Sequence, residues 1–283
     1  MVKFLAGISL LLITLEGLSA QMNGINREGC GVSFFRTMIV NGTEVKETQY
    51  PWMVYLSTHH PYGKHACGGT IITKRHVLTA AHCLWLKNAH VYKVIVSYGS
   101  VDRRKGRKVE ASKMLIHKGY SENRMLNDIA LLEVKYPFKF RTEVTPICLQ
   151  MTPVPIGDKE AVAAGWGSYY VGGPGYNFLR HTTVTIYSDE MCTLLSMGSS
   201  YSATLQCCAH KRSTGVCSGD SGGPLMIMTP FNRFQQVGIS SYVRGKCGGK
   251  LPDVYTRVSG HAMWLTWATS SSADYMPLDI TKA

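Results

Sequence analysis

The sequence predicts an all-β fold with two lobes, and three observations support this prediction. Short runs of β-branched and aromatic residues, such as 91–96 and 129–134, recur between Gly and Pro clusters from Ile39 onward. The stretch 151–157 contains two prolines, which stiffen the chain and supply no backbone donors, so we interpret it as a linker between halves of similar size. The 283 residues are 45% hydrophobic and 17% charged, which is enough apolar material for packed cores.

The cysteine content and the N-terminus predict a secreted, extracellular protein. Nine cysteines are too many for a typical cytosolic enzyme, and they lack the paired short spacings of structural zinc sites. Residues 1–20 have the form of a signal peptide, because Lys3 precedes an apolar run that ends near the small residue Ala20. That run is shorter than the roughly 20 residues that a bilayer span needs. We therefore expect no membrane span.

The segments at either end of the main domain differ from it in composition. Residues 21–38 are polar, lack periodicity and include Cys30, so we interpret them as a pro-segment before a domain at 39–269. One amphipathic helix, packed by its aromatic face, is predicted near the end of the domain from the helical spacing of Met263, Trp264, Trp267 and Ala268. The C-terminal tail, 270–283, is expected to be disordered. Asn41 begins a sequon, and both a glycosylated and an unmodified side chain remain open.

The net charge indicates only the sign of the charge that a binding partner would carry. Lys and Arg number 30 and Asp and Glu number 18, which gives a formal charge of +12. Such a balance favours acidic partners without choosing among nucleic acids, sulfated glycans and membrane surfaces. No specific nucleic acid is implied by charge alone.

Three short segments, 79–83, 128–131 and 219–224, carry the chemistry. They read TAAHC, DIAL and GDSGGP, and together they resemble the chymotrypsin-like serine proteases over roughly residues 30–269. The resemblance implies two antiparallel six-stranded β-barrels with a C-terminal helix and an active site in the cleft between them. It also implies hydrolysis of protein or peptide substrates without a cofactor, and sensitivity to protein protease inhibitors.

The reaction requires a specific set of groups. A hydroxyl is a poor nucleophile at its free pKa, so acyl transfer needs a nearby base and a third group that fixes the base's tautomer. His82, Asp128 and Ser221 fit these roles, although each alone also suits a core histidine, a strand cap or a turn serine. The amides of Gly219 and Ser221 are the expected oxyanion hole. Ser241 matches the family serine that contacts the aspartate, with an ordinary strand serine as the alternative.

The cysteines support the same resemblance. It implies four disulfides, which are Cys30–Cys148, Cys67–Cys83, Cys192–Cys208 and Cys217–Cys247. Ala161 and Ile227 occupy the positions of a further family bridge, as expected if that bridge was lost as a unit. Cys207 is left over, as a buried thiol or an intermolecular partner, and the sequence does not order it against Cys208.

A basic loop stands where many trypsin-like relatives carry an acidic calcium loop. Calcium needs several oxygen ligands, so we expect no metal here. The loop either forms an exosite for a heparin-like polyanion or is merely solvated. Its five cations are Arg103, Arg104, Lys105, Arg107 and Lys108.

The predicted substrate pocket departs from the trypsin pattern. Gly215 replaces the aspartate that pairs with a basic substrate, while Val216 and Val243 narrow the pocket, so these segments look most like neutrophil elastase. Small aliphatic side chains are therefore the expected substrates, with broad or basic specificity through Asp253 as the alternative. The residues expected to bind substrate are Gly215, Val216, Ser218, Ser241, Tyr242, Val243 and Asp253.

Activation is expected to create a new N-terminus at Ile39. Ile39 and the three residues after it resemble the family's activated terminus, whose α-amino group pairs with Asp220 and orders the oxyanion hole. A trypsin-like cut after Arg36 leaves two extra residues, so we expect either a cut after Met38 or later loss of a dipeptide. Cys30 keeps the pro-segment attached in both cases.

The sequence thus predicts a secreted serine endopeptidase made as a zymogen. Two other classes remain as alternatives: a poorly activated protease homologue that acts as an anion-binding protein, and a structural extracellular module. The intact catalytic motifs argue against the first alternative, and the second does not explain them.

Overall fold

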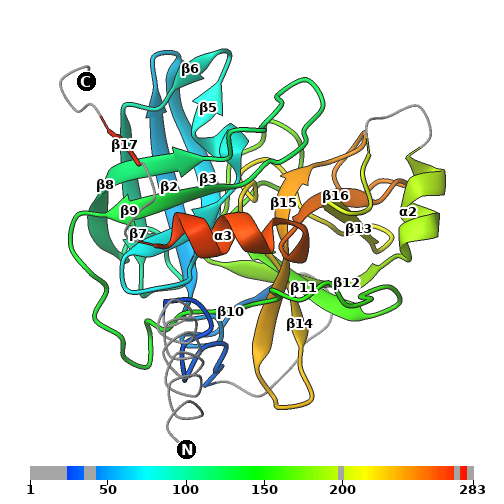
Figure 1. Ribbon diagram of the computed structural model, residues 1–283, viewed down its shortest axis with the longest axis horizontal. Coiled ribbons are helices and arrows are strands. Elements are labelled where there is room, and N and C mark those ends of the chain that lie inside the picture. Colours follow the sequence, from blue (N-terminus) through cyan, green and yellow to red (C-terminus); the bar gives the residue numbers. More distant parts are fainter. Residues whose placement is uncertain (1–23, 35–42, 197–200, 271–274, 279–283) are drawn as a thin grey trace, which may run out of the picture.

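Two closed barrels, each of six antiparallel strands, organise the chain (Figure 1). The computed structural model describes residues 24–34, 43–196, 201–270 and 275–278. The first barrel closes through pairing of β8 with β9. Its strands are β2 (Met53–His60), β3 (Gly63–Ile71), β4 (His76–Thr79), β7 (Lys93–Tyr98), β8 (Arg107–Ile116) and β9 (Ala130–Val134).

The second barrel closes through pairing of β12 with β13. Its strands are β11 (Glu160–Gly165), β12 (Arg180–Ile186), β13 (Gln206–His210), β14 (Pro224–Met228), β15 (Phe234–Tyr242) and β16 (Asp253–Arg257). Two short strands join its edges: β1 (Thr43–Glu44) pairs with β12, and β10 (Cys148–Leu149) runs parallel to β15. Residues 151–157, the predicted linker, follow β10 and precede β11, the first of these six strands.

Side-chain alternation explains why these segments form barrel strands. In β2, Val54 and Leu56 are fully buried, whereas Tyr55 between them and Ser57 after Leu56 are only partly buried. This period of two places one face of each strand in the barrel core. The runs predicted as strands at 91–96 and 129–134 correspond to β7 and β9.

Buried polar contacts lock the two barrels together. The indole Nε1 of Trp52, just before β2, donates to the Met226 sulfur in β14 at 3.2 Å. The Thr70 hydroxyl donates to the Gln236 side-chain oxygen at 2.7 Å, and all four residues are buried. Because buried polar groups are costly to leave unpaired, these contacts favour one relative placement of the barrels. The relative placement of the two barrels is therefore set by contacts in the core.

Within the described residues the helices are few and short. They are η1 (Ala81–Cys83), α2 (Asp189–Leu195), η2 (Ser259–His261) and α3 (Ala262–Ala268). The helix predicted near the C-terminus is α3, but its predicted aromatic packing face is wrong: Leu265 and Ala268 are buried, while Met263 is 90% exposed and Trp267 is 38% exposed. Trp264 alone of the two tryptophans packs against the core cluster. The buried face follows the i, i+3 step from Leu265 to Ala268.

The C-terminal tail is ordered where the structure describes it, in contrast to the disorder expected from its sequence. β17 (Met276–Pro277) pairs antiparallel with β8, beside the first barrel (Figure 1). The Tyr275 hydroxyl donates to the Ala268 carbonyl at 2.8 Å, and Leu278 is buried. The tail therefore extends the barrel sheet by one strand. A small hairpin of β5 (Trp85–Leu86) and β6 (Ala89–His90) lies apart from both barrels' sheets.

The described part of the expected pro-segment, 24–34, is docked on the protein. The Asn26 side chain exchanges hydrogen bonds with the backbone of Leu149, and the amide of Gly31 donates to the Pro146 carbonyl. The expected signal peptide at 1–20, Ile39 and Asn41 lie outside the described residues. None of the helices in the described part of the chain is long and apolar enough to span a membrane.

Candidate active site

The two barrels contribute different members of the candidate triad. His82 lies in η1, directly after β4, and Asp128 lies in the loop just before β9, so both come from the first barrel. Ser221 lies in the loop before β14, and Ser241 lies in β15, so both come from the second barrel. The Ser221 carbonyl accepts a hydrogen bond from the Gly68 amide at 2.7 Å across the junction. The candidate site therefore forms only where the barrels meet.

Asp128 fixes the position of the His82 ring. One carboxylate oxygen accepts from the His82 backbone amide at 2.9 Å, and the other lies 2.7 Å from His82 Nδ1. The Ser241 hydroxyl donates to that second oxygen at 2.6 Å. Asp128 is fully buried, so these bonds hold its charge in a fixed direction. This geometry places the proton on Nδ1 and leaves Nε2 free to accept one.

Asp128 also changes the proton affinity of His82. Burial lowers the pKa of His82, but the nearby charge of Asp128 and the hydrogen bond to it raise the pKa by more. The net result is a pKa above the ordinary value. A base with a raised pKa near the working pH is suited to general acid–base catalysis.

Ser221 and His82, the expected nucleophile and base, lie at the same barrel junction but are not hydrogen-bonded to each other. No hydrogen bond joins the Ser221 hydroxyl to His82 Nε2. The Cys83 sulfur, one residue after His82, lies 3.6 Å from the Ser221 carbonyl oxygen. Such catalytic contacts are often long without substrate and shorten when substrate binds.

The loop before Ser221 presents two free amides. Within the described residues, neither the Gly219 nor the Ser221 amide donates a hydrogen bond. Gly219 has φ +95°, a conformation that favours glycine, and a Cβ there would lie 3.2 Å from the Gly167 Cα. Gly222 has φ +78°, and a Cβ there would lie 2.2 Å from the Thr79 hydroxyl. The glycines therefore allow the backbone shape that an oxyanion hole needs.

The structure contains four disulfides, and they are the pairs that the resemblance implied: Cys30–Cys148, Cys67–Cys83, Cys192–Cys208 and Cys217–Cys247. Cys207 is free and fully buried, and burial raises the pKa of its thiol to about 12. This favours the inert buried thiol over the intermolecular bridge. Ala161 and Ile227, at the positions of the missing bridge, both belong to the core of the second barrel.

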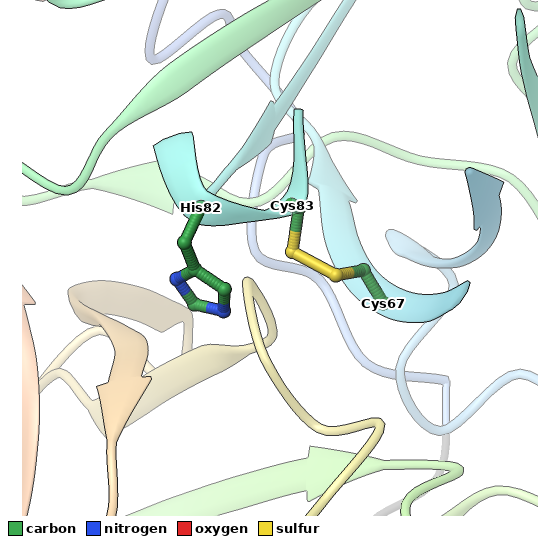
Figure 2. A group of neighbouring side chains, drawn as sticks. All are labelled: Cys67, His82 and Cys83. Atoms are coloured by element: carbon green, nitrogen blue, oxygen red, sulfur yellow. A yellow bond between two sulfur atoms is a disulfide. The ribbon is translucent and has the colours of Figure 1, made fainter. Parts of the chain in front are cut away.

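One cluster in the described residues has the residue types of a metal site. Figure 2 shows Cys67, His82 and Cys83, whose candidate ligand atoms lie within 4.8 Å of one another. The two sulfurs are bonded to each other, so neither is a thiolate able to bind a metal. His82 Nδ1 is held by Asp128. This cluster therefore fits a disulfide beside a catalytic base.

Asp220 is among the lining residues of a cavity of about 330 Å³. Its two oxygens accept hydrogen bonds from the Gly167 amide at 2.7 Å and the Cys217 amide at 2.9 Å. Burial raises the pKa of Asp220 to about 6, against the lowering effect of these amides. Within the described residues no cation pairs with it. The carboxylate is therefore held at the cavity wall with capacity for a positive partner.

The residues expected to bind substrate lie in the loop before Ser221, at the end of β15 and directly after it, and at the start of β16. Val216 is buried and lines the cavity of about 330 Å³, and Val243 packs against the core cluster that contains Val216. Asp253 is 5% exposed, and its Oδ2 accepts from the Val216 amide at 3.1 Å. Tyr242 is partly buried and Ser218 is exposed near the oxyanion loop. The structure thus brings the aliphatic residues and the carboxylate together.

Only part of the positive charge of the basic loop lacks a pairing partner among the described residues. Arg104 binds the buried Asp102 with two hydrogen bonds of 2.8 Å, and Arg107 pairs with Glu143 at 2.9 Å. Arg103 donates to the Tyr55 hydroxyl at 3.3 Å, and its guanidinium lies over the Tyr55 ring. Lys105 and Lys108 are exposed and form no ion pair with the described residues. Most of the arginine charge in the loop is therefore compensated locally.

A second cavity, of about 510 Å³, lies beside the catalytic histidine's loop and was not foreseen from the sequence. Trp85 and His90 of the β5–β6 hairpin, Tyr120, and Met276 of β17 are among its lining residues. The place of Met276 in this cavity could not be predicted from the sequence, because it depends on the pairing of β17 with β8, and these strands lie far apart in the chain. Thr256, whose hydroxyl donates to the Asp128 carbonyl at 2.9 Å, was missed for the same reason.

Comparisons with protein families and with known sequences agree with this fold and site. A family model described as Trypsin matches residues 39–265. Serine protease SP24D of Anopheles gambiae is 35% identical over 230 residues, which cover 80% of this chain and 79% of the relative. Chymotrypsin-2 of Vespa crabro is 36% identical over 228 residues, which cover 80% of this chain and 98% of the relative.

Comparison with solved structures finds proteins with a similar fold. Human heparin binding protein has a TM-score of 0.66 and 27% identity, covering 80% of this chain and 95% of that chain. HL collagenase has a TM-score of 0.72 at 24% identity, covering 82% of this chain and 98% of that chain, and this likeness shows the fold alone. With two closed barrels, His82 and Asp128 from one and Ser221 from the other, and a family match over residues 39–265, the chain belongs to the trypsin family of chymotrypsin-like serine proteases.

Proposed function

We infer that the protein is a secreted serine endopeptidase, made as a zymogen, that cleaves peptide bonds through an acyl-enzyme. The observation that carries this inference is the hydrogen-bonded order of Ser241, Asp128 and His82 beside Ser221. Protein and peptide substrates and protein protease inhibitors are the proposed partners. No cofactor is required by the chemistry.

The reaction proceeds in two halves. The Ser221 hydroxyl oxygen attacks the carbonyl carbon of the substrate while His82 Nε2 takes its proton, and the carbonyl oxygen becomes an oxyanion. The Gly219 and Ser221 amides donate to that oxyanion. His82 then gives the proton to the leaving amine as the peptide C–N bond breaks. Water, deprotonated by His82, hydrolyses the acyl-enzyme and regenerates Ser221.

Primary specificity is proposed to be for small aliphatic residues before the cleaved bond. Val216 and Val243 limit the room, and one methylene in a hydrophobic pocket is worth about 1–3 kcal/mol in selectivity. Broad or basic specificity is the alternative, because Asp253 adds a carboxylate beside Gly215. The aliphatic residues outnumber this one charge, so we rank the aliphatic preference first.

Activation is proposed to produce a chain that begins at Ile39. The new α-amino group would enter the cavity lined by Asp220 and supply its missing cation. A terminus two residues longer would not reach, which would leave a buried charge unpaired at a typical cost of about 3–5 kcal/mol. The Cys30–Cys148 disulfide would hold the pro-segment on the enzyme after the cut.

A diverse peptide pool tests the endopeptidase function. Activated wild-type protein should cut internal bonds, and the P1 residues should be mainly Val and Ala. Ser221→Ala should lower turnover by about a million-fold, because only oxyanion stabilisation and binding remain. Equal cleavage by wild type and Ser221→Ala would remove the assignment. A leading Arg or Lys preference would replace the aliphatic proposal with the basic one.

The anion-binding alternative has one specific observation behind it, which is the exposure of Lys105 and Lys108 without ion pairs in the described residues. A heparin column should retain the protein, with retention falling steeply as salt rises. Replacing these two lysines by Ser should reduce retention more than replacing Arg104 and Arg107, which are already paired. Retention that is unchanged after both lysines are replaced would show that the loop is only solvated.

A further inference from the structure

We propose that a cavity between the pro-segment and the first barrel binds the sulfate groups of a sulfated glycan. The cations of this site are Arg27 of the pro-segment and Lys74 and Arg75, which lie in the turn between β3 and β4. The site lies outside the basic loop at 103–108 and uses none of the residues proposed for catalysis. The proposal is therefore independent of the endopeptidase function.

The cavity has a volume of about 240 Å³ and is lined by segments that lie far apart in the chain. Gly24 and Arg27 of the pro-segment line it together with residues 72–76 of the first barrel, and with Phe140 and Pro146. A Cβ on Gly24 would lie 3.7 Å from the Thr73 methyl group, so the two segments approach each other closely. The site is therefore complete only while the pro-segment is docked on the barrel.

Hydrogen bonds fix the backbone on both sides of the cavity. The Asn26 side chain, one residue before the pro-segment cation, donates to the Leu149 carbonyl at 2.8 Å and accepts from the Leu149 amide at 2.6 Å. The Thr73 hydroxyl oxygen accepts from the amides of Arg75 and His76 at 3.1 and 3.0 Å. The positions of the cations are therefore set before an anion binds, which lowers the entropy cost of binding.

The positive charge around the cavity is largely uncompensated. Within the described residues, neither Arg27 nor Lys74 forms an ion pair. Arg75 lies 3.9 Å from Glu133, whose other carboxylate oxygen pairs with Lys113 at 3.2 Å. No acidic residue is among the described residues that line the cavity. The site therefore keeps a net positive charge that an anion can neutralise.

The basic loop at 103–108 differs in this respect. There Asp102 pairs with Arg104, and Glu143 pairs with Arg107. Glu28, which is the one acidic residue in 24–34, is exposed and is not among the residues that line the cavity. An anion at the cavity therefore does not compete with a carboxylate for its cations, whereas an anion at the loop competes for both of these arginines.

The shape of the site indicates which kind of anion it binds. Sulfate esters project from a sugar chain as terminal groups, so a sulfate can enter a cavity while the chain stays outside. The phosphates of a nucleic acid lie within its backbone, and the surface of a bilayer is too broad to enter. Guanidinium and ammonium groups donate strong charge-assisted hydrogen bonds to such oxygens. A sulfated glycan therefore fits the site best.

Calorimetric titration of the uncut protein with a heparin oligosaccharide tests this proposal. The double variant Arg27→Ser/Lys74→Ser should bind at least about tenfold more weakly, because it loses two hydrogen-bonded contacts to charged groups. Lys105→Ser/Lys108→Ser is the matched control, since it removes the same charge from the basic loop, and it should lose much less affinity. The desulfated oligosaccharide, single-stranded DNA and vesicles of anionic lipid should not distinguish the two variants.

A footprint on the wild-type protein makes the test independent of the folding of any variant. Lysine acetylation, measured by mass spectrometry, should be slowed by the oligosaccharide at Lys74 and should be unchanged at Lys105 and Lys108. Equal loss of affinity in the two double variants, or protection of the loop lysines without Lys74, would overturn the proposal. DNA or vesicles that bind more tightly than the oligosaccharide, and that lose affinity in the Arg27→Ser/Lys74→Ser variant alone, would also contradict a glycan ligand.

Discussion

Among single residues, Asp128 has the largest influence on the site. It is fully buried and holds His82 at two points, the backbone amide and Nδ1. Ser241 and Thr256 hold Asp128 in turn, one through its side chain and one through its carbonyl. The direction of the imidazole is therefore set before any substrate arrives, which reduces the reorganisation needed in the reaction.

The raised pKa of His82 predicts the acid limit of activity. A protonated imidazole cannot take the Ser221 proton, so kcat/KM should fall as pH falls through the His82 pKa, which lies above the ordinary value of about 6.5. Asp128→Asn should move this midpoint to lower pH and lower turnover by about 10⁴-fold. A norleucine substrate measured from pH 5 to pH 9 checks both effects. An unchanged midpoint in Asp128→Asn would show that Asp128 does not set the His82 pKa.

The residues with catalytic chemistry could be predicted from the sequence because their motifs are short and contiguous. His82, Asp128 and Ser221 each stand in such a motif, and the structure brings them to one junction. Thr256 could not be predicted, because an ordinary strand threonine meets Asp128 only through the fold.

Among the elements, the loop from Gly215 to Gly223 serves several parts of the site. It carries the oxyanion amides, the nucleophile and Asp220, and it contacts Asp253. A Cβ on Gly165 of β11 would lie 2.0 Å from the Asp220 carboxylate, so the loop also fits closely against the second barrel. The conformation of this loop therefore affects every part of the candidate site at once.

The tail strand β17 should stabilise the first barrel. Leu278 is buried beside β8, whereas Met276 two residues earlier is 46% exposed and provides a matched control. Leu278→Ala should lower the unfolding free energy by about 2 kcal/mol, at the low end for buried Leu→Ala changes. Thermal unfolding should show a loss of about 4–8 °C. Met276→Ala should change the midpoint little, and equal effects of the two substitutions would mean that the tail is not packed as described.

Element prediction from sequence succeeded where side-chain patterns are local. The strands β7 and β9 follow from β-branched runs. Helix α2 was not predicted, although Ser188 followed by Asp189 and Glu190 is a helix-start signal, and the Ser188 hydroxyl does accept from the Met191 amide. The packing face of α3 was predicted wrongly because the size and apolar character of Trp267 do not show whether its side chain faces the core or the solvent.

For the whole molecule, two barrels joined by one continuous apolar cluster supply complementary halves of the candidate site. The two-lobed architecture could be predicted from strand runs and the proline-rich linker, since these depend on composition. The docking of residues 24–34 could not, because Asn26 and Gly31 bind partners more than a hundred residues away. The pro-segment thus has its own binding surface, in addition to its disulfide.

The central claim is that Ser221 becomes a reactive nucleophile when the chain begins at Ile39. Labelling by an organofluorophosphate, followed by mass spectrometry of the peptide that contains Ser221 and by N-terminal sequencing, tests it directly. We predict one label per chain, on Ser221, in protein that begins at Ile39, little label in uncut protein, and none in Ser221→Ala. Absence of label from the Ile39 form would contradict the claim, as would full labelling of a species that begins at Thr37.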